Sequence, residues 1–128
     1  MNEHSKKMRD LLDEYGYTDA ESVLDEWNYV ESWGDGFTES IKVIIGHKGA
    51  AYTLATMCDA QNGSIDLLMY YDARPCAMNG IFNMYTYRPR KGYFTIYSYA
   101  NIYELGTEAY SECEDEDIYV IPATDGSK

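Results

Sequence analysis

The stretch SIDLLMYY, residues 64–71, constrains the fold more than any other part of this chain. Its second half is apolar without interruption. That pattern is typical of a strand buried on both faces in a parallel sheet, whereas a half-exposed strand alternates. Val23 and Leu24, which precede the pair Glu26–Trp27, predict a second strand of the same kind. Because parallel strands need a long crossover connection, the chain is predicted to contain βα units.

The segments around these strands have helical patterns. Residues 3–15 carry apolar side chains at helical spacing and stop at Gly16. Residues 37–62 predict one helix or a helix pair with a break near GHKGAA, and residues 93–106 predict another helix that closes at Gly106. The order of elements therefore favours an α/β fold.

Two buried parallel strands cannot cover both of their faces alone, so the pattern predicts part of a closed or doubly wound sheet with helices outside it. We expect residues 1–106 to be the last two βα units of a (β/α)8 TIM barrel, a partial barrel truncated at both ends. Residues 107–128, with two short β-like runs around an acidic turn, are expected to begin a β-sandwich-like accessory domain. The irregular segment 72–92 is long for a loop and is expected to be functional.

Charge and composition restrict the partners. The chain of 128 residues has a net charge of -12, and a surface of that sign repels phosphate backbones and anionic lipid. Neither a signal peptide nor an apolar run of membrane-spanning length is present in the sequence. We expect no nucleic-acid and no membrane partner, and a cytoplasmic location is favoured. The 14 tyrosines suit half-buried packing or contact with sugar rings.

Metal and cofactor sites are not predicted. Cys58, Cys76 and Cys113 are widely spaced and are interpreted as reduced thiols. His4 and His47 lack a second ligand at a suitable spacing, and the acidic run ECEDED lacks the central glycine of a calcium loop.

Three stretches together resemble the end of a retaining glycoside hydrolase barrel, with the family 39 β-xylosidase and α-iduronidase group as the nearest match. They are VLDEWNYVESW, HKGAAYTLATMCDAQNGSIDLLMYYDARP and KGYFTIYSYANIYELGTE. In that group the penultimate barrel strand ends in an acid followed by an aromatic residue and often Asn. The resemblance extends over roughly residues 5–106.

The resemblance implies that Glu26 is the catalytic nucleophile of a glycosidase that acts on O-glycosidic bonds of oligo- or polysaccharides, with no cofactor. The active sites of such barrels lie at the C-terminal ends of the strands, which agrees with the position of Glu26 at the end of a predicted strand. A retaining hydrolase needs a second carboxylate as acid and base, usually within an Asn-Glu pair in this family. The only such pair is Asn2-Glu3, before any strand, so we expect the isolated chain to be inactive.

The other candidate residues lie near the ends of the two predicted strands or shortly after them. Trp27 and Trp33 either pack between strand and helices or stack on sugar rings, and Asn28 completes the family motif as a substrate contact. Asp25 is expected to point away from Glu26 by strand alternation and to be structural. The remaining candidates lie where the second strand opens into its loop and either contact substrate or pair with each other: Tyr70, Tyr71, Asp72 and Arg74.

Three functions remain open. The first is a piece of a xylosidase-like hydrolase that supplies the nucleophile-bearing strand. The second is a non-catalytic carbohydrate-binding or interaction protein derived from such an enzyme. The third is a non-functional remnant that forms homo-oligomers, because exposed strand edges pair readily with another copy.

Overall fold

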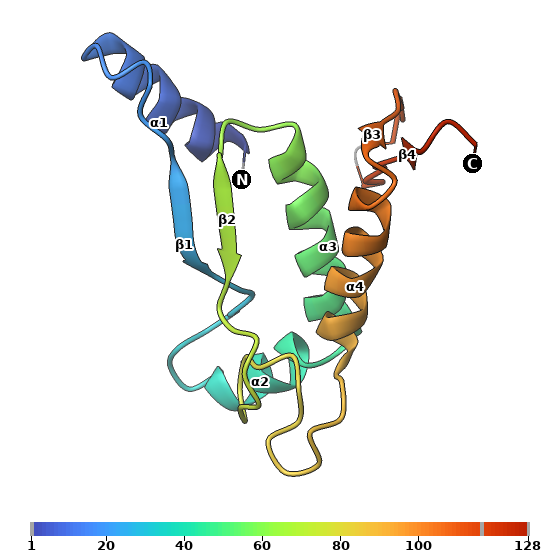
Figure 1. Cartoon of the computed structure of the whole chain (residues 1–128). Helices are drawn as coiled ribbons and strands as arrows, with labels where there is room; N and C mark the ends of the chain where they lie inside the picture. Colours follow the sequence, from blue (N-terminus) through green and yellow to red (C-terminus); the bar gives the residue numbers. More distant parts are fainter. Residues whose placement is uncertain (1, 116, 128) are drawn as a thin grey trace.

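The structure is a computed structural model that describes residues 2–115 and 117–127. Two strands are interspersed among the helices in the first part of the chain, with two consecutive helices between them, and two very short strands follow the last helix (Figure 1). The elements are α1 (Asn2–Glu14), β1 (Val23–Trp27), α2 (Phe37–Ile44), α3 (His47–Gln61), β2 (Leu67–Tyr70), α4 (Lys91–Tyr103), β3 (Thr107–Glu108) and β4 (Ala123–Thr124).

Helix α1 confirms the prediction over residues 3–15. Ion pairs at i,i+4 spacing, such as Lys6 with Asp10 at 2.8 Å, support its exposed face. The helix ends at Glu14, and Gly16 follows with a φ of 82°, the left-handed conformation that glycine adopts most readily. Arg9 then donates hydrogen bonds to the carbonyl groups of Tyr17 and Ala20 and fixes the loop that leads to β1.

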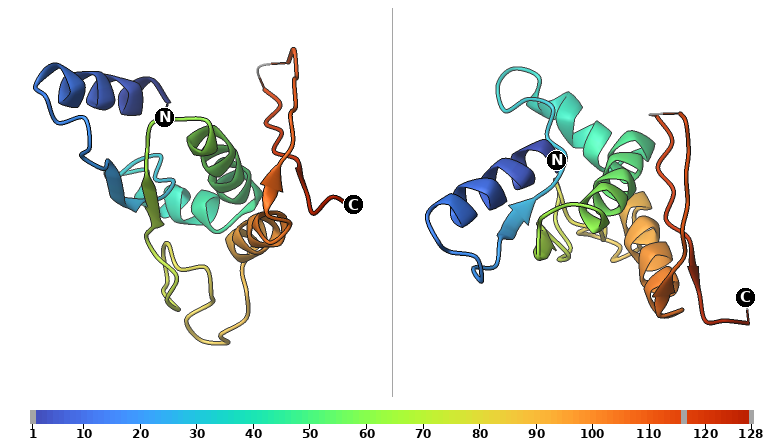
Figure 2. Two further views of the ribbon diagram at one scale, coloured as in Figure 1. Left: turned by 45° about the horizontal axis from the view of Figure 1, so that its top comes forward. Right: turned by 90° about the horizontal axis from the view of Figure 1, so that it is seen from above.

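Strands β1 and β2 are parallel, as the two apolar segments predict. Val23 pairs with Leu67, and Trp27 pairs with Tyr70. The predicted crossover is also confirmed, because α2 and α3 lie between the two strands in the chain. In Figure 2, α3 and α4 lie side by side next to the strand pair, and these two helices pack on one another.

The core lies between β1–β2 and the helices. Among the described residues, the buried apolar side chains are few, and each retains some exposure: Trp27, Ile44, Ala50, Cys58 and Ile81. The other face of the strand pair is only partly covered, since Val23 is 49% exposed and Leu67 and Met69 are each 46% exposed. The two strands are therefore better covered on the face toward the helices, where Trp27 is buried and Leu24, Leu68 and Tyr70 are partly buried.

The predicted partial (β/α)8 barrel is wrong. Among the described residues the strands form two separate sheets of two strands each, β1–β2 and β3–β4. A barrel wall needs a strand on both sides of each member, and here β1 and β2 pair only with each other. The prediction failed because a continuous apolar run indicates a strand with little polar surface, but it does not supply the neighbouring strands that would bury both faces.

The C-terminal part is irregular. Strands β3 and β4 are antiparallel and two residues long, with Thr107 opposite Thr124. They are too short to establish a β-sandwich, so the expected accessory domain and the boundary at Gly106 stay predictions. Both Glu116 and Lys128 of the predicted accessory segment lie outside the described residues.

Candidate functional site

The carboxyl ends of β1 and β2 meet at one edge of the sheet. The backbone N–H of Tyr71 donates to the carbonyl oxygen of Trp27 at 2.9 Å and extends the pairing by one step. The carbonyl oxygen of Tyr71 accepts hydrogen bonds from the side-chain amides of Asn28 at 2.6 Å and Asn79 at 3.0 Å. Both strand ends are thereby fixed to the loop after β2, and the predicted residues around Glu26 and Tyr71 share one edge.

Glu26 and Asp25 lie in an irregular part of β1. Leu24 pairs with Leu68 and Trp27 with Tyr70, so two residues of β1 stand opposite a single residue of β2. This is the arrangement of a β-bulge, which interrupts the alternation of side chains. The expectation that Asp25 points away from Glu26 rests on that alternation and stays a prediction. Both carboxylates are exposed to solvent.

Trp27 and Tyr70 face the helices. Trp27 is 8% exposed, and the two rings make an edge-to-face contact with centroids 5.3 Å apart. The Tyr70 hydroxyl donates to the carbonyl oxygen of Asn79 at 3.2 Å. Burial, with a smaller contribution from the negative charge of Asp72, raises the pKa of Tyr70 to about 12. Of the two interpretations of Trp27, packing between strand and helices is the one that fits this position.

Tyr71, Asp72 and Arg74 form a compact polar cluster at the same edge. The Arg74 Nε atom lies 2.6 Å from Asp72 Oδ2, and the Asp72 side chain is 14% exposed. The Arg74 guanidinium also donates to the Tyr71 hydroxyl at 3.1 Å and lies 5.7 Å from the ring centroid. The charge of Asp72 raises the pKa of Arg74. The interpretation in which Asp72 and Arg74 pair with each other therefore describes the structure, and Tyr71 remains 37% exposed beside them.

Trp33 lies elsewhere, in the loop before α2. It is 71% exposed and stacks on Phe37 with a centroid distance of 5.5 Å. It is not among the side chains that contact the cluster of Tyr71, Asp72 and Arg74.

Asn79 is the residue of this site that sequence reasoning missed. It is 2% exposed, and its side-chain oxygen accepts a hydrogen bond from the Cys76 thiol at 3.1 Å while its amide holds the Tyr71 carbonyl. Its Asn-Gly pair with Gly80 is a turn signal that was visible in the sequence. A Cβ atom on Gly80 would collide with the Arg74 carbonyl oxygen, so this turn needs glycine.

The described residues contain no group of three or more His, Cys, Asp or Glu side chains placed to hold a metal ion. His47 Nδ1 lies 3.0 Å from the Lys91 ammonium nitrogen. Within the same part of the chain, no helix has the length and apolar character needed to cross a membrane.

Cys76 and Cys58 differ in the environment of their thiols. Burial is the largest influence on the pKa of Cys76 and raises it, but hydrogen bonds from the backbone N–H groups of residues 78–80 outweigh burial, so the pKa lies below its usual value. Burial raises the pKa of the Cys58 thiol in α3.

We therefore expect Cys76 to be alkylated by iodoacetamide at lower pH than Cys58. Only the thiolate reacts, so a lowered pKa moves the half-maximal rate to lower pH and a raised pKa moves it higher. Peptide mapping by mass spectrometry over a neutral to alkaline series measures both profiles. The two profiles should coincide in denaturant, and a native profile with Cys58 reacting first would contradict the assignment.

Comparisons with protein-family models, with curated proteins and with solved structures find no match to this chain. The resemblance to family 39 glycoside hydrolases therefore stays a prediction that rests on the quoted residues alone.

Proposed function

We propose that the edge at which β1 and β2 end binds a sugar, and that Glu26 acts there as the nucleophile of a retaining, xylosidase-like glycoside hydrolase. The observation that carries the proposal is the convergence of polar groups on this edge. Exposed Glu26 lies two residues before Asn28, whose side-chain amide donates to the Tyr71 carbonyl oxygen, and the Asp72–Arg74 pair directly follows Tyr71.

The chemical character of the edge supports a sugar ligand. Sugar rings present apolar faces and hydroxyl groups, which suit an exposed aromatic ring with charged hydrogen-bonding groups at its border. The exposed ring of Tyr71 has the guanidinium of Arg74 at one side, and the Asp72 carboxylate holds that guanidinium in place at 2.6 Å. The Arg74 guanidinium, whose side chain is 65% exposed, is thus available to donate hydrogen bonds to sugar hydroxyls beside this ring.

In the proposed reaction the Glu26 carboxylate attacks the anomeric carbon and forms a glycosyl-enzyme ester while the leaving group departs. A second carboxyl group about 5 Å away protonates the leaving oxygen and later activates water. Asp72 is already engaged by Arg74, so we assign the acid/base role to no described residue. The chain supplies the nucleophile in this proposal, and the acid/base carboxylate comes from another polypeptide segment.

A second candidate is a carbohydrate-binding protein without catalysis. The engagement of Asp72 by Arg74 favours this alternative, because it leaves Glu26 without an identified acid partner while the exposed Tyr71 ring stays accessible. Saturable binding of a xylo-oligosaccharide without turnover is its expected behaviour.

The decisive experiment is incubation of the chain with a dinitrophenyl fluoroxyloside, followed by peptide mass spectrometry. Dinitrophenolate leaves without protonation, so formation of the covalent ester needs the nucleophile and does not need the missing acid. We expect the sugar mass on the peptide that contains Glu26. Glu26→Gln should abolish the label and the matched variant Asp25→Asn should retain it. A label elsewhere overturns the assignment, and binding without a label favours the second candidate.

A further inference from the structure

An open cavity of about 410 Å³ lies where the C-terminal ends of α3 and α4 meet the short strand β3. Three of its lining residues are the last residues of these elements, namely Gln61 of α3, Tyr103 of α4 and Glu108 of β3. The volume falls within the range of pockets that hold small molecules. Glu26 is not among the lining residues, so this cavity is separate from the edge proposed to bind sugar.

The charged side chains of this cavity are acidic. The described lining residues include Glu104 and Glu108 and no Lys, Arg or His. Neither of the two carboxylates forms an ion pair with a described residue. Helices α3 and α4 also lack a basic residue in their last turns, although the negative end of a helix dipole favours a cation there. The cavity therefore has a negative potential that no cation of the described chain neutralises.

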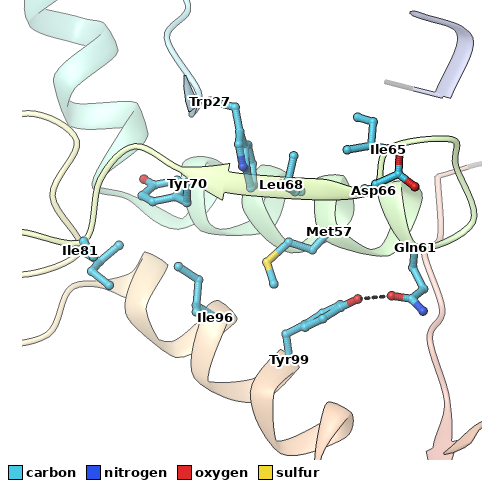
Figure 3. A pocket seen from close by; sticks show the side chains of 12 residues that line it. Trp27, Met57, Gln61, Ile65, Asp66, Leu68, Tyr70, Ile81, Ile96 and Tyr99 are labelled. Atoms are coloured by element: carbon cyan, nitrogen blue, oxygen red, sulfur yellow. Dashed lines mark hydrogen bonds between the residues drawn. The ribbon is translucent and has the colours of Figure 1, made fainter. Parts of the chain in front are cut away.

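A chain of hydrogen bonds holds the Glu108 carboxylate at the cavity. The Tyr99 hydroxyl donates to Gln61 Oε1 at 2.6 Å, and Figure 3 shows this bond from a neighbouring cavity that both residues also line. The Gln61 amide in turn donates to Glu108 Oε2 at 3.2 Å. Burial, followed by the negative charges of the Cys58 thiolate and Glu108, raises the pKa of Tyr99, so its hydroxyl stays protonated and donates. The second carboxylate oxygen of Glu108 accepts no hydrogen bond from a described residue and is available to a ligand.

The other walls of the cavity are apolar or aromatic. Ile102, Ile121 and Pro122 line it with hydrocarbon, and the Tyr103 side chain beside them belongs to a residue that is 79% exposed. The face of an aromatic ring attracts a cation. A metal ion is not favoured here, because the described residues contain no group of three or more His, Cys, Asp or Glu side chains placed to hold one. These walls instead suit a cation that carries an apolar body.

We propose that this cavity binds a small organic cation, a primary ammonium group on a compact apolar body. The ammonium group donates a hydrogen bond to the free oxygen of the Glu108 carboxylate, beside the rings of Tyr99 and Tyr103. The apolar body lies against Ile102 and Pro122. The site does not depend on the sugar-binding edge.

The test uses the full chain, labelled with ¹⁵N, in about 0.15 M salt, which screens most of the long-range attraction from the net charge of -12. The matched probes are phenethylamine, a cation at neutral pH, and phenethyl alcohol, which has the same apolar body without the charge. We expect phenethylamine to move the backbone N–H resonances of Gly106, Thr107 and Glu108 saturably, and the alcohol to bind roughly ten-fold more weakly. Equal affinity for the two probes, or shifts spread over acidic residues outside the cavity, overturns the proposal.

A pair of variants separates the cavity from the general charge of the surface. Glu108→Gln removes one negative charge and keeps the side-chain shape, so we expect phenethylamine to bind roughly five-fold more weakly and phenethyl alcohol to be nearly unaffected. Glu114→Gln is the matched control, because it changes the net charge equally in the same C-terminal segment and Glu114 does not line the cavity. It should affect neither probe. An unchanged affinity for the amine in Glu108→Gln, or an equal loss in both variants, would overturn the proposal. The comparison of the two probes on the wild-type chain decides the matter if Glu108→Gln does not fold.

Discussion

Glu26→Ala is expected to lower the turnover of an aryl xyloside by roughly three orders of magnitude or more. The assay protein joins this chain to the segment that carries the acid/base carboxylate. The physical reason is that alanine removes the atom that forms the covalent intermediate, and the acid/base group cannot replace it. Steady-state kinetics with a dinitrophenyl xyloside measure the loss directly, because such a substrate isolates the nucleophilic step from leaving-group protonation.

Azide provides the matched rescue experiment. A small anion fits the space left by the carboxylate and attacks the opposite face of the sugar, so Glu26→Ala should regain partial activity and give the glycosyl azide with inverted configuration. Asp25→Asn alters the neighbouring exposed carboxylate and should keep turnover within a few-fold of wild type. Near-normal turnover in Glu26→Ala, or a product with retained configuration, contradicts the nucleophile assignment.

The local elements could be predicted from the sequence because each has a short-range cause. Gly16 terminates α1 through a positive φ, and the apolar run before Tyr71 forms β2. The barrel could not be inferred safely, because burial of both strand faces depends on strands that the pattern does not contain. The exposure of Val23, Leu67 and Met69 shows the difference between a strand that is apolar and one that is covered.

The candidate site was predictable in part for the same reason. Parallel strands end at one edge, so residues that follow β1 and β2 had to come together there, and the Asn28 amide does bind the Tyr71 carbonyl at 2.6 Å. Trp27 and Tyr70 turn toward the helices instead. The bulge that breaks the alternation, and the loop that returns buried Asn79 to the strand ends, depend on tertiary contacts.

The connection between α2 and α3 depends on a close approach that only glycine permits. A Cβ atom on Gly49 would lie 2.7 Å from both the Cα and the carbonyl carbon of Ile44 and would also collide with its carbonyl oxygen. These are backbone atoms and cannot rotate away. Ile44 is 6% exposed and belongs to the small core, so a shift of its backbone also disturbs core packing.

Gly49→Ala is therefore expected to lower the free energy of unfolding by about 3 kcal/mol and the Tm by roughly 10 °C. Gly92→Ala in α4 is the matched control, because its Cβ would meet only Ile81 Cγ2, at an ordinary 3.7 Å. Alanine gives the unfolded chain less backbone entropy than glycine does, so the Gly92→Ala variant should be as stable as wild type or more stable by about 0.5 kcal/mol. Urea titration followed by circular dichroism compares both variants with wild type. Equal stability of the two alanine variants would mean that α2 and α3 can move apart without loss of stability. The close contact of Gly49 with Ile44 would then not determine the position of the crossover beside β1 and β2.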